Sequence, residues 1–379
     1  MPETANDVFQ ENSVRIGLLP EPANSAFQET TLVEGAVAWL RERLPQRWEV
    51  DGGSSGAADT QIVIRAPQSH TTIVVEARRT LAPRDVAAWT SGLARSLRTA
   101  VPYVPILVVA PWLSSRAREA LAEAGLNYLD MTGNALLRLD NPAVYISSAG
   151  AERNPLPPAR PAASLRGPKA ARLIRLLADV RPPYGVGELA AAAGLTPGYV
   201  SRLLDRLDRE AIVDRGPRGA VAEVDVGALL RAWAEDYDVF RRELTTTWLA
   251  PGGAPSALSS LADAPGRTAV TGSFAAVRLA PVAAPSLLVA YCERVEDTAD
   301  ALGLLPADAA PNVVLLRPFD EVVWARTQDE DGVGYAASSQ VVVDCLTGDG
   351  RMPAEGDALL AALVADDGWR AADLTAVTS

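Results

Sequence analysis

The stretch from Tyr184 to Asp225 constrains the fold of this chain more than any other. Its first part, Gly187–Ala193, has apolar residues at helical spacing, and Gly194 ends that helix as a residue in a left-handed turn would. Thr196 has the side chain of an N-cap. Pro197 suits the first helical position, because the N–H that proline lacks would be unpaired there. The pattern therefore predicts two short helices joined by a tight turn.

The second of these helices, Pro197–Asp208, is amphipathic. One face carries the apolar stripe Val200, Leu203, Leu204 and Leu207, and the other carries Tyr199, Ser201, Arg202, Asp205, Arg206 and Arg209. Two short strands, Ala211–Arg215 and Ala220–Asp225, are expected around the turn Gly216–Gly219. Together with a preceding helix over Lys169–Val180, these elements predict a winged helix-turn-helix domain over residues 168–226.

A domain of this kind is expected to bind double-stranded DNA. An α-helix fits the major groove, and arginine can pair with guanine or with phosphate. Between Arg153 and Arg218 there are 12 Lys/Arg residues against 6 Asp/Glu, inside a chain whose formal net charge is −12. This local excess of positive charge is typical of a DNA-binding surface. The alternative is a winged helix that serves protein contacts.

The candidate DNA-binding residues lie on the helix, at its cap and in the wing. We expect base-proximal contacts from Tyr199, Ser201 and Arg202, and phosphate contacts from Arg206, Arg209 and Arg218. Thr196, Arg215 and Lys169 complete the candidate set.

Composition narrows the compartment and the chemistry. Residues 1–24 have no basic segment followed by an apolar core, so we expect a disordered leader and not a signal peptide. No apolar run reaches the roughly 20 residues that span a bilayer, which predicts a cytoplasmic protein without membrane contacts. Cys292 and Cys345 are expected to be buried free thiols. No cofactor and no metal site are expected.

Strands alternate with helices over residues 25–150, which predicts an α/β domain. We expect helices at Thr31–Leu44, Asp85–Thr99 and Ser114–Ala124, and strands at Thr60–Arg65, Thr72–Arg78, Pro105–Ala110, Asn127–Met131 and Ala135–Leu139. The turn Thr132–Asn134 joins the last two strands. This order resembles the restriction-endonuclease-like fold.

In that fold an acidic residue and a following (Asp/Glu)-x-Lys hold a metal that activates water. The corresponding residues here are Asp59, Glu76 and Arg78. Arg78 stands where the lysine belongs, and a guanidinium stays protonated, so it cannot accept a proton from water. We therefore expect a vestigial site in a chain that is not an enzyme. The alternative is a metal-dependent nuclease that the winged helix directs to DNA.

Two further segments follow from composition and periodicity. Residues 151–167 are rich in Pro, Ala and Arg and are expected to be a linker. Val226–Leu249, whose aromatic residues follow a helical period, predicts one long connecting helix over 227–250 that favours a homodimer.

The last region, 266–379, is expected to be a second α/β domain after a Pro/Gly/Ser-rich joint at Pro251–Pro265. We expect strands at Thr268–Val270, Leu287–Cys292, Val313–Leu316 and Glu321–Ala325, and helices opening at Thr271 and covering Val295–Leu304, Ser338–Leu346 and Ala354–Val364.

This half of the chain carries a family resemblance in three segments: TGSFAAVRLAP (Thr271–Pro281), PNVVLLRPFDEVVWAR (Pro311–Arg326) and SSQVVVDCLTGDGRMPAEGDALLAAL (Ser338–Leu363). From Leu165 to Val364 the chain resembles the AbiEi family, antitoxin-type regulators that combine a winged helix with an α/β C-terminal domain. The resemblance implies a DNA-binding repressor that controls its own operon, without enzymatic activity, or an antitoxin that binds a partner toxin.

Overall fold

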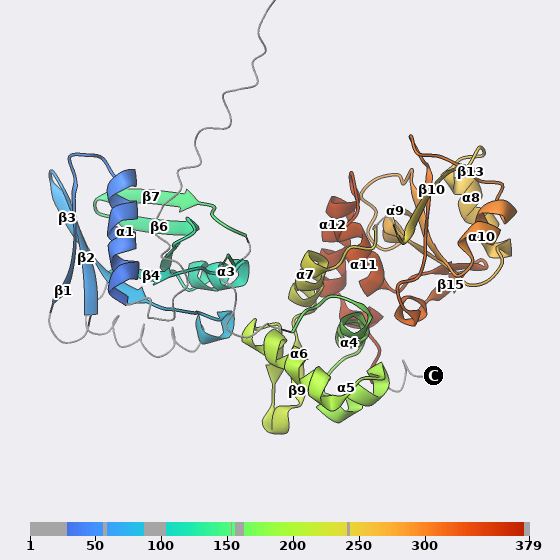
Figure 1. Cartoon of the computed structure of the whole chain (residues 1–379), viewed down its shortest axis with the longest axis horizontal. Helices are drawn as coiled ribbons and strands as arrows, with labels where there is room; N and C mark the ends of the chain where they lie inside the picture. The colour runs from blue at the N-terminus through green and yellow to red at the C-terminus, as the bar shows by residue number, and fades with distance from the viewer. Residues whose placement is uncertain are drawn as a thin grey trace, which may run out of the picture. The chain divides into compact units, whose positions relative to one another are not determined.

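The computed structural model describes residues 29–55, 59–86, 104–152, 154–155, 163–240 and 243–374 (Figure 1). The leader 1–24 and most of the helix expected over Asp85–Thr99 lie outside these residues. The chain divides into two compact units. The first contains the described residues of 1–80, 101–113 and 125–152, and the second contains those of 81–100, 114–124 and 153–379. Each unit is described by itself.

The first unit is built on a seven-stranded sheet whose strands are neighbours in chain order. The strands are β1 (Glu49–Ser55), β2 (Asp59–Ala66), β3 (Ser69–Ala77), β4 (Ile106–Ala110), β5 (Asn127–Asp130), β6 (Ala135–Asp140) and β7 (Ala143–Ser148). β3, β4 and β5 run parallel, and the other neighbours are antiparallel. The predicted α/β organisation is confirmed, with β1 and β7 as additional strands.

Helix α1 (Glu29–Arg43) provides the other layer of this core. Leu32, Ala36 and Leu40 are fully buried at helical spacing, in one cluster with Ile62, Ile64 and Ile73 of the sheet. The run Ile106–Ala110 is buried throughout, as expected of a central parallel strand. The predicted turn after β5 is organised by the buried carboxylate of Asp130, which accepts hydrogen bonds from Thr132 and Asn134.

In the second unit the predicted helix-turn-helix is present. Its helices are α4 (Pro168–Asp179), α5 (Val186–Ala193) and α6 (Pro197–Arg209), and its wing pairs β8 (Val213–Arg215) with β9 (Val221–Val224). Gly194 adopts the left-handed conformation, with φ 63°, at the C-cap of α5. The Thr196 side chain accepts a hydrogen bond from the Tyr199 N–H, which caps α6. The turn is therefore made by the residues that predicted it.

The C-terminal part of this unit is a second seven-stranded sheet, in the order β13-β10-β14-β12-β11-β16-β15. Its strands are β10 (Thr245–Leu249), β11 (Thr268–Thr271), β12 (Leu288–Cys292), β13 (Leu305–Pro306), β14 (Val313–Leu316), β15 (Gln328–Glu330) and β16 (Val333–Tyr335). The helices of this part are α7 (Val226–Asp236), α8 (Ala254–Ser260), α9 (Gly272–Ala276), α10 (Val295–Ala301), α11 (Ser338–Leu346) and α12 (Met352–Ala365), and α3 (Ser115–Glu123) joins the unit from earlier in the chain. Short 3-10 turns are η1 (Pro217–Gly219), η2 (Leu261–Asp263), η3 (Glu321–Trp324) and η4 (Asp367–Trp369).

The prediction of one long connecting helix over 227–250 is wrong beyond Asp236. α7 ends at Asp236, and Tyr237 turns to extended backbone, φ −97° and ψ 140°, where its hydroxyl reaches the buried Asp344. The β-branched run Thr245–Thr247 then starts β10, which pairs with β13 and β14. The C-terminal sheet therefore begins before residue 266.

Three further expectations need correction or placement. The strand predicted at Glu321–Ala325 is the 3-10 turn η3, which the Asp320 side chain caps. The joint expected at Pro251–Pro265 contains α8 and η2. Helix α3, which Ser114 caps, groups with the second unit, where Arg116 donates to the Glu210 and Ala211 carbonyls.

The winged helix and the C-terminal sheet share one hydrophobic core, which runs from Leu165 to Leu363. Buried Arg175 of α4 crosses this core and binds Asp179, the Gln340 side chain and the Val322 and Ala325 carbonyls. Leu165, at the end of the predicted linker, is fully buried. We conclude that the winged helix packs directly against the C-terminal sheet within one compact unit.

Cys292 and Cys345 are buried and free, as expected, and burial raises the pKa of the Cys292 thiol to about 12. Among the described residues no helix is both long enough and apolar enough to span a bilayer.

Candidate nucleic-acid interface

Helix α6 separates a buried face from an exposed one. Val200, Leu203, Leu204 and Leu207 are completely buried in the shared core. Arg202, Asp205 and Arg209 are exposed on the other side, and Thr196 is exposed at the cap. The predicted apolar stripe therefore fixes which side of α6 faces solvent.

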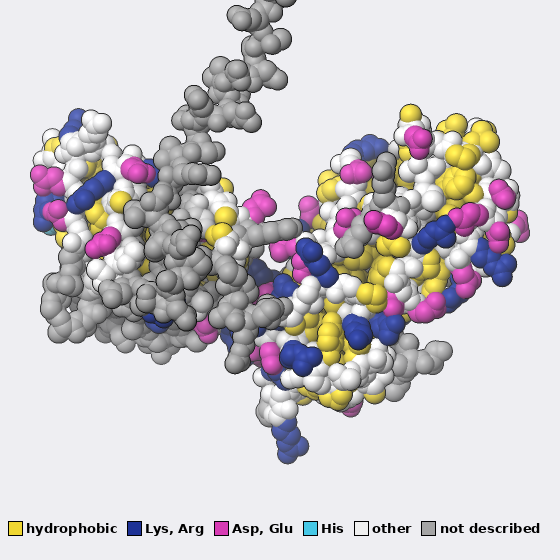
Figure 2. Space-filling model, viewed as in Figure 1, with side chains coloured by type: hydrophobic (Ala, Val, Ile, Leu, Met, Phe, Trp, Pro, Cys, Tyr) yellow, Lys and Arg dark blue, Asp and Glu magenta, His cyan; other side chains and the backbone are white. Residues whose placement is uncertain are grey.

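Four of the candidate cations remain available to a ligand. Arg202, Lys169 and Arg218 are exposed, and within the described ranges no hydrogen bond or ion pair engages their side chains. Arg209 is also exposed and donates through Nε to the Asp205 carbonyl, 3.1 Å away in its own helix. Figure 2 shows Lys and Arg side chains at the tip of the wing, at the bottom of the view.

Arg206, which we expected to contact phosphate, is engaged inside the protein. Its Nε donates to Glu210 at 2.9 Å and its Nη1 donates to the Ala163 carbonyl at 2.8 Å. Nη1 also lies 3.6 Å from an Asp236 carboxylate oxygen, and the side chain is 18% exposed. Arg206 therefore ties the end of the linker to α6 and α7.

Arg215 is engaged as well. Its Nε and Nη2 both donate to the Gly219 carbonyl at 3.1 Å, and its Nη1 forms an ion pair with Asp205 of α6. With 20% of the side chain exposed, Arg215 links the wing to the helix.

Two of the expected base-proximal residues, Tyr199 and Ser201, are half-buried beside Arg202. Tyr199 packs against the shared core. Burial raises the pKa of Tyr199 and the charge of Arg202 opposes that rise, so the hydroxyl is neutral at pH 7. A neutral tyrosine hydroxyl can donate or accept a hydrogen bond at the helix surface.

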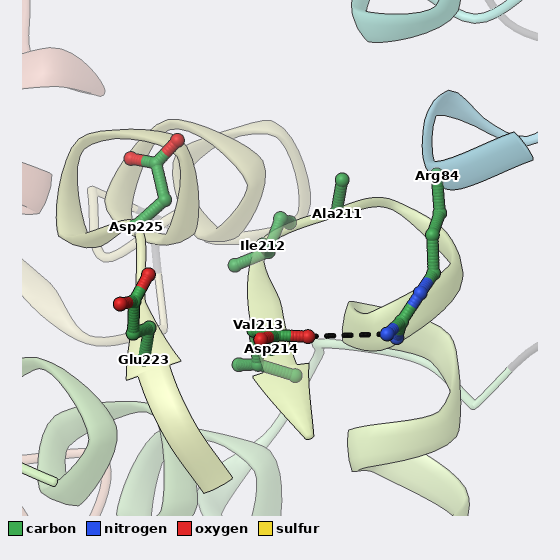
Figure 3. Close-up of a pocket in the computed structure, with 7 residues that line it drawn as sticks. All are labelled: Arg84, Ala211, Ile212, Val213, Asp214, Glu223 and Asp225. Atoms are coloured by element: carbon green, nitrogen blue, oxygen red, sulfur yellow. Dashed lines mark hydrogen bonds and ion pairs between the residues drawn. The ribbon is translucent and has the colours of Figure 1, made fainter. Parts of the chain in front are cut away.

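Acidic side chains gather around a cavity beside the wing strands β8 and β9. A cavity of about 170 Å³ is lined by Arg84, Ala211, Ile212, Val213, Asp214, Glu223 and Asp225 (Figure 3). Arg84 points toward Asp214 and donates to it at 3.1 Å. Asp214 pairs with Arg84 and Asp225 pairs with Arg116, so no cation of this cavity is left over for a phosphate. The α6 side of the wing is therefore the candidate DNA surface.

The residues for which we expect a vestigial metal site lie in the first unit. The register that pairs Thr60 with Val75 places Asp59 and Glu76 at the same end of the β2–β3 ladder. Glu76 forms an ion pair with Arg78, with 2.5 Å between Oε1 and Nη2. Within the described part of the chain, no three His, Cys, Asp or Glu side chains gather as metal ligands would.

Comparison with known proteins bears on the winged helix. The sequence model described as the IclR helix-turn-helix domain matches residues 168–217, which cover α4, α5, α6, β8 and the start of the wing turn. The chain therefore contains a helix-turn-helix DNA-binding domain, and this supports a winged-helix transcriptional regulator.

No curated protein matches the chain. A solved structure described as EndoMS in apo form is similar at 20% identity, over 28% of this chain and 47% of that one, with a TM-score of 0.19. The chain thus spans about half the length of that protein, and a TM-score this low supports no conclusion about fold or function.

Proposed function

We propose that this protein is a sequence-specific DNA-binding transcriptional regulator that places α6 in the major groove. The observation that carries the proposal is the exposed guanidinium of Arg202, on the solvent face of a capped helix within the matched helix-turn-helix. Side chains in the first turns of a recognition helix reach base edges, and arginine binds guanine bidentately.

The remaining available cations suit the phosphate backbone. Lys169 lies in the first turn of α4, where the helix dipole also favours an anion. Arg209 ends α6 and Arg218 lies at the tip of the wing. Arg206 and Arg215 serve the proposed function by holding elements in place, since their donors are already engaged.

The test starts with enrichment of a binding site from random duplex DNA, followed by affinity measurements with variants. Arg202→Ala should cost about 1–3 kcal/mol on the enriched site and relax the preference at one base. Arg231→Ala is the matched control, because this exposed arginine of α7 pairs with Asp357 of α12 and is not among the candidate DNA contacts. Equal affinity for enriched and random DNA, or equal losses in both variants, would contradict the proposal.

We also propose that the first unit is a restriction-endonuclease-like scaffold without catalytic activity. The mixed sheet with parallel β3, β4 and β5, and the ion pair that occupies Glu76, support this reading. Incubation with supercoiled DNA and Mg²⁺ should leave the DNA intact. Nicking that disappears in Glu76→Ala would instead establish the nuclease.

The resemblance to AbiEi antitoxins adds a finer proposal, in which the protein is a homodimer that represses its own operon. Its three segments fall on β11–α9, β14–η3 and α11–α12, which belong to the core that also holds the winged helix. Light scattering measures the dimer. A reporter fused to the upstream DNA measures repression, and co-purification from the native host tests for a partner toxin.

A further inference from the structure

We propose that Arg215 is a positioning residue that holds the wing at a fixed place relative to α6, and so sets where Arg218 meets the DNA backbone. The inference rests on the proposed function, because it concerns how the same surface engages DNA. It assigns Arg215 and Asp205 a role that neither charge nor periodicity indicates.

The contacts of Arg215 join the two parts of the interface. Its Nε and Nη2 groups both donate to the Gly219 carbonyl at the end of the wing turn. Its Nη1 group forms an ion pair with the Asp205 carboxylate on the exposed face of α6. Planar guanidinium groups can span two acceptors in this way, whereas the ammonium of lysine is a point charge. Arg215 therefore connects the recognition helix to the turn that carries Arg218.

The turn itself requires such support. Arg218 and Gly219 have φ values of 64° and 77°, a conformation that residues with side chains rarely adopt. The turn is held by backbone bonds from Gly216 to Ala220 and from Gly219 to Gly216, and by the grip of Arg215 on Gly219. A Cβ on residue 219 would lie 2.8 Å from Arg215 Nη2, so the guanidinium occupies the space that glycine leaves open.

The ion pair with Arg215 also neutralises the negative charge of Asp205 on the exposed face of α6. Asp205, with 56% of its side chain exposed, lies on the same face as Arg202 and would repel phosphate if it were unpaired. Pairing with Arg215 compensates that charge. The pair thus shapes the DNA-facing surface, although an exposed ion pair adds little to stability.

A double-mutant cycle on the full chain tests the role, with the duplex enriched from random DNA as the probe. Loss of one phosphate contact reduces the salt slope by about 0.9, which corresponds to roughly 15-fold in affinity at 50 mM salt and roughly 4-fold at 200 mM. We expect Arg218→Ala to cost about that much in the native chain. In an Arg215→Ala or Arg215→Lys background the same change should cost less than about 3-fold, because the wing is no longer held.

The Arg215→Lys variant separates position from charge. The inference is overturned if Arg218→Ala reduces DNA affinity in the Arg215→Lys background as much as it does in the native chain. In that case the fold losses of the two single variants multiply, and Arg215 acts through its charge on the DNA. Asp205→Asn removes a negative charge. If Asp205 only repels phosphate, this variant should bind DNA more tightly, and Arg218→Ala should reduce its affinity as much as in the native chain. The inference predicts a reduced Arg218 cost in that background too.

Hydrogen exchange without DNA provides a second measurement that does not depend on affinity. The Gly216 and Gly219 amides should exchange faster in Arg215→Lys, whereas the amides of α4 should be unchanged. Unchanged exchange in the wing overturns the inference alone. Failure of the native chain to prefer the enriched duplex would overturn the proposed function, which the exchange experiment does not test.

Discussion

The carboxyl group of Asp344 should make the stability of the second unit fall as the pH rises through the mildly acidic range. Asp344 is completely buried on α11. It accepts hydrogen bonds from Thr271 Oγ1 at 2.7 Å, from the Tyr237 and Tyr291 hydroxyls at 2.9 and 3.0 Å, and from Gln340 Nε2 at 2.9 Å. Burial raises the pKa of Asp344 from 3.8 to about 6, and these hydrogen bonds oppose the rise.

The sign follows from proton linkage. Between pH 4 and 6 the folded chain holds a proton on Asp344 that the unfolded chain has lost, so raising the pH favours unfolding. A difference of about two pKa units corresponds to about 3 kcal/mol. Asp344→Asn removes this ionisation. The free energy of unfolding of the native chain, relative to that of the variant, should therefore be about 3 kcal/mol lower above pH 6 than below pH 4.

Urea unfolding at pH 4 and pH 7, followed by tryptophan fluorescence, measures this change, because Trp233 is buried in the same core. The native chain should lose stability relative to Asp344→Asn as the pH rises. Asp357→Asn, at an exposed carboxylate, is the control and should show no such trend. A native-to-Asn difference that is the same at both pH values would refute the reasoning about buried charge.

Two further predictions concern the helix-turn-helix. Arg175→Met should lower the free energy of unfolding by about 3–5 kcal/mol in urea titrations, because Asp179, 2% exposed, would lose its buried partner; a loss below about 1 kcal/mol would show that the pair is not needed. Thr196→Ala removes the N-cap of α6 and should cost about 1 kcal/mol, seen as a lower Tm, with Thr196→Ser retaining the native value; equal losses in both variants would argue against the cap.

The sequence was most informative where the signals are local. Gly194, Thr196 and Pro197 determine the turn by their own conformational preferences, and the apolar stripe of α6 determines its buried face. The aromatic residues keep a helical period beyond Asp236, so the pattern predicts a longer helix than α7. A tertiary contact ends it, since the Tyr237 hydroxyl binds Asp344 more than 100 residues away. The run Thr245–Thr247 was the available signal for a strand.

The candidate site was predictable as a surface but not residue by residue. Periodicity placed Arg202, Arg206 and Arg209 on the polar side of α6 alike. Only the fold shows that Arg206 donates to the carbonyl of Ala163, which lies 43 residues earlier in the chain, before α4. Similarly, the position of Arg215 in a short strand gives no sign that its guanidinium reaches Asp205. Which arginines remain free for DNA depends on these long-range partners.

The most direct test of the central claim is a gel-shift titration of the purified chain with the DNA upstream of its own gene. It includes excess competitor DNA, samples with and without Mg²⁺, and the double variant Arg202→Ala/Arg218→Ala. We predict a sharp shift with intact DNA in the native chain and its loss in the variant. No shift, or shortened DNA only with Mg²⁺, would contradict the regulator and direct attention to Asp59 and Glu76.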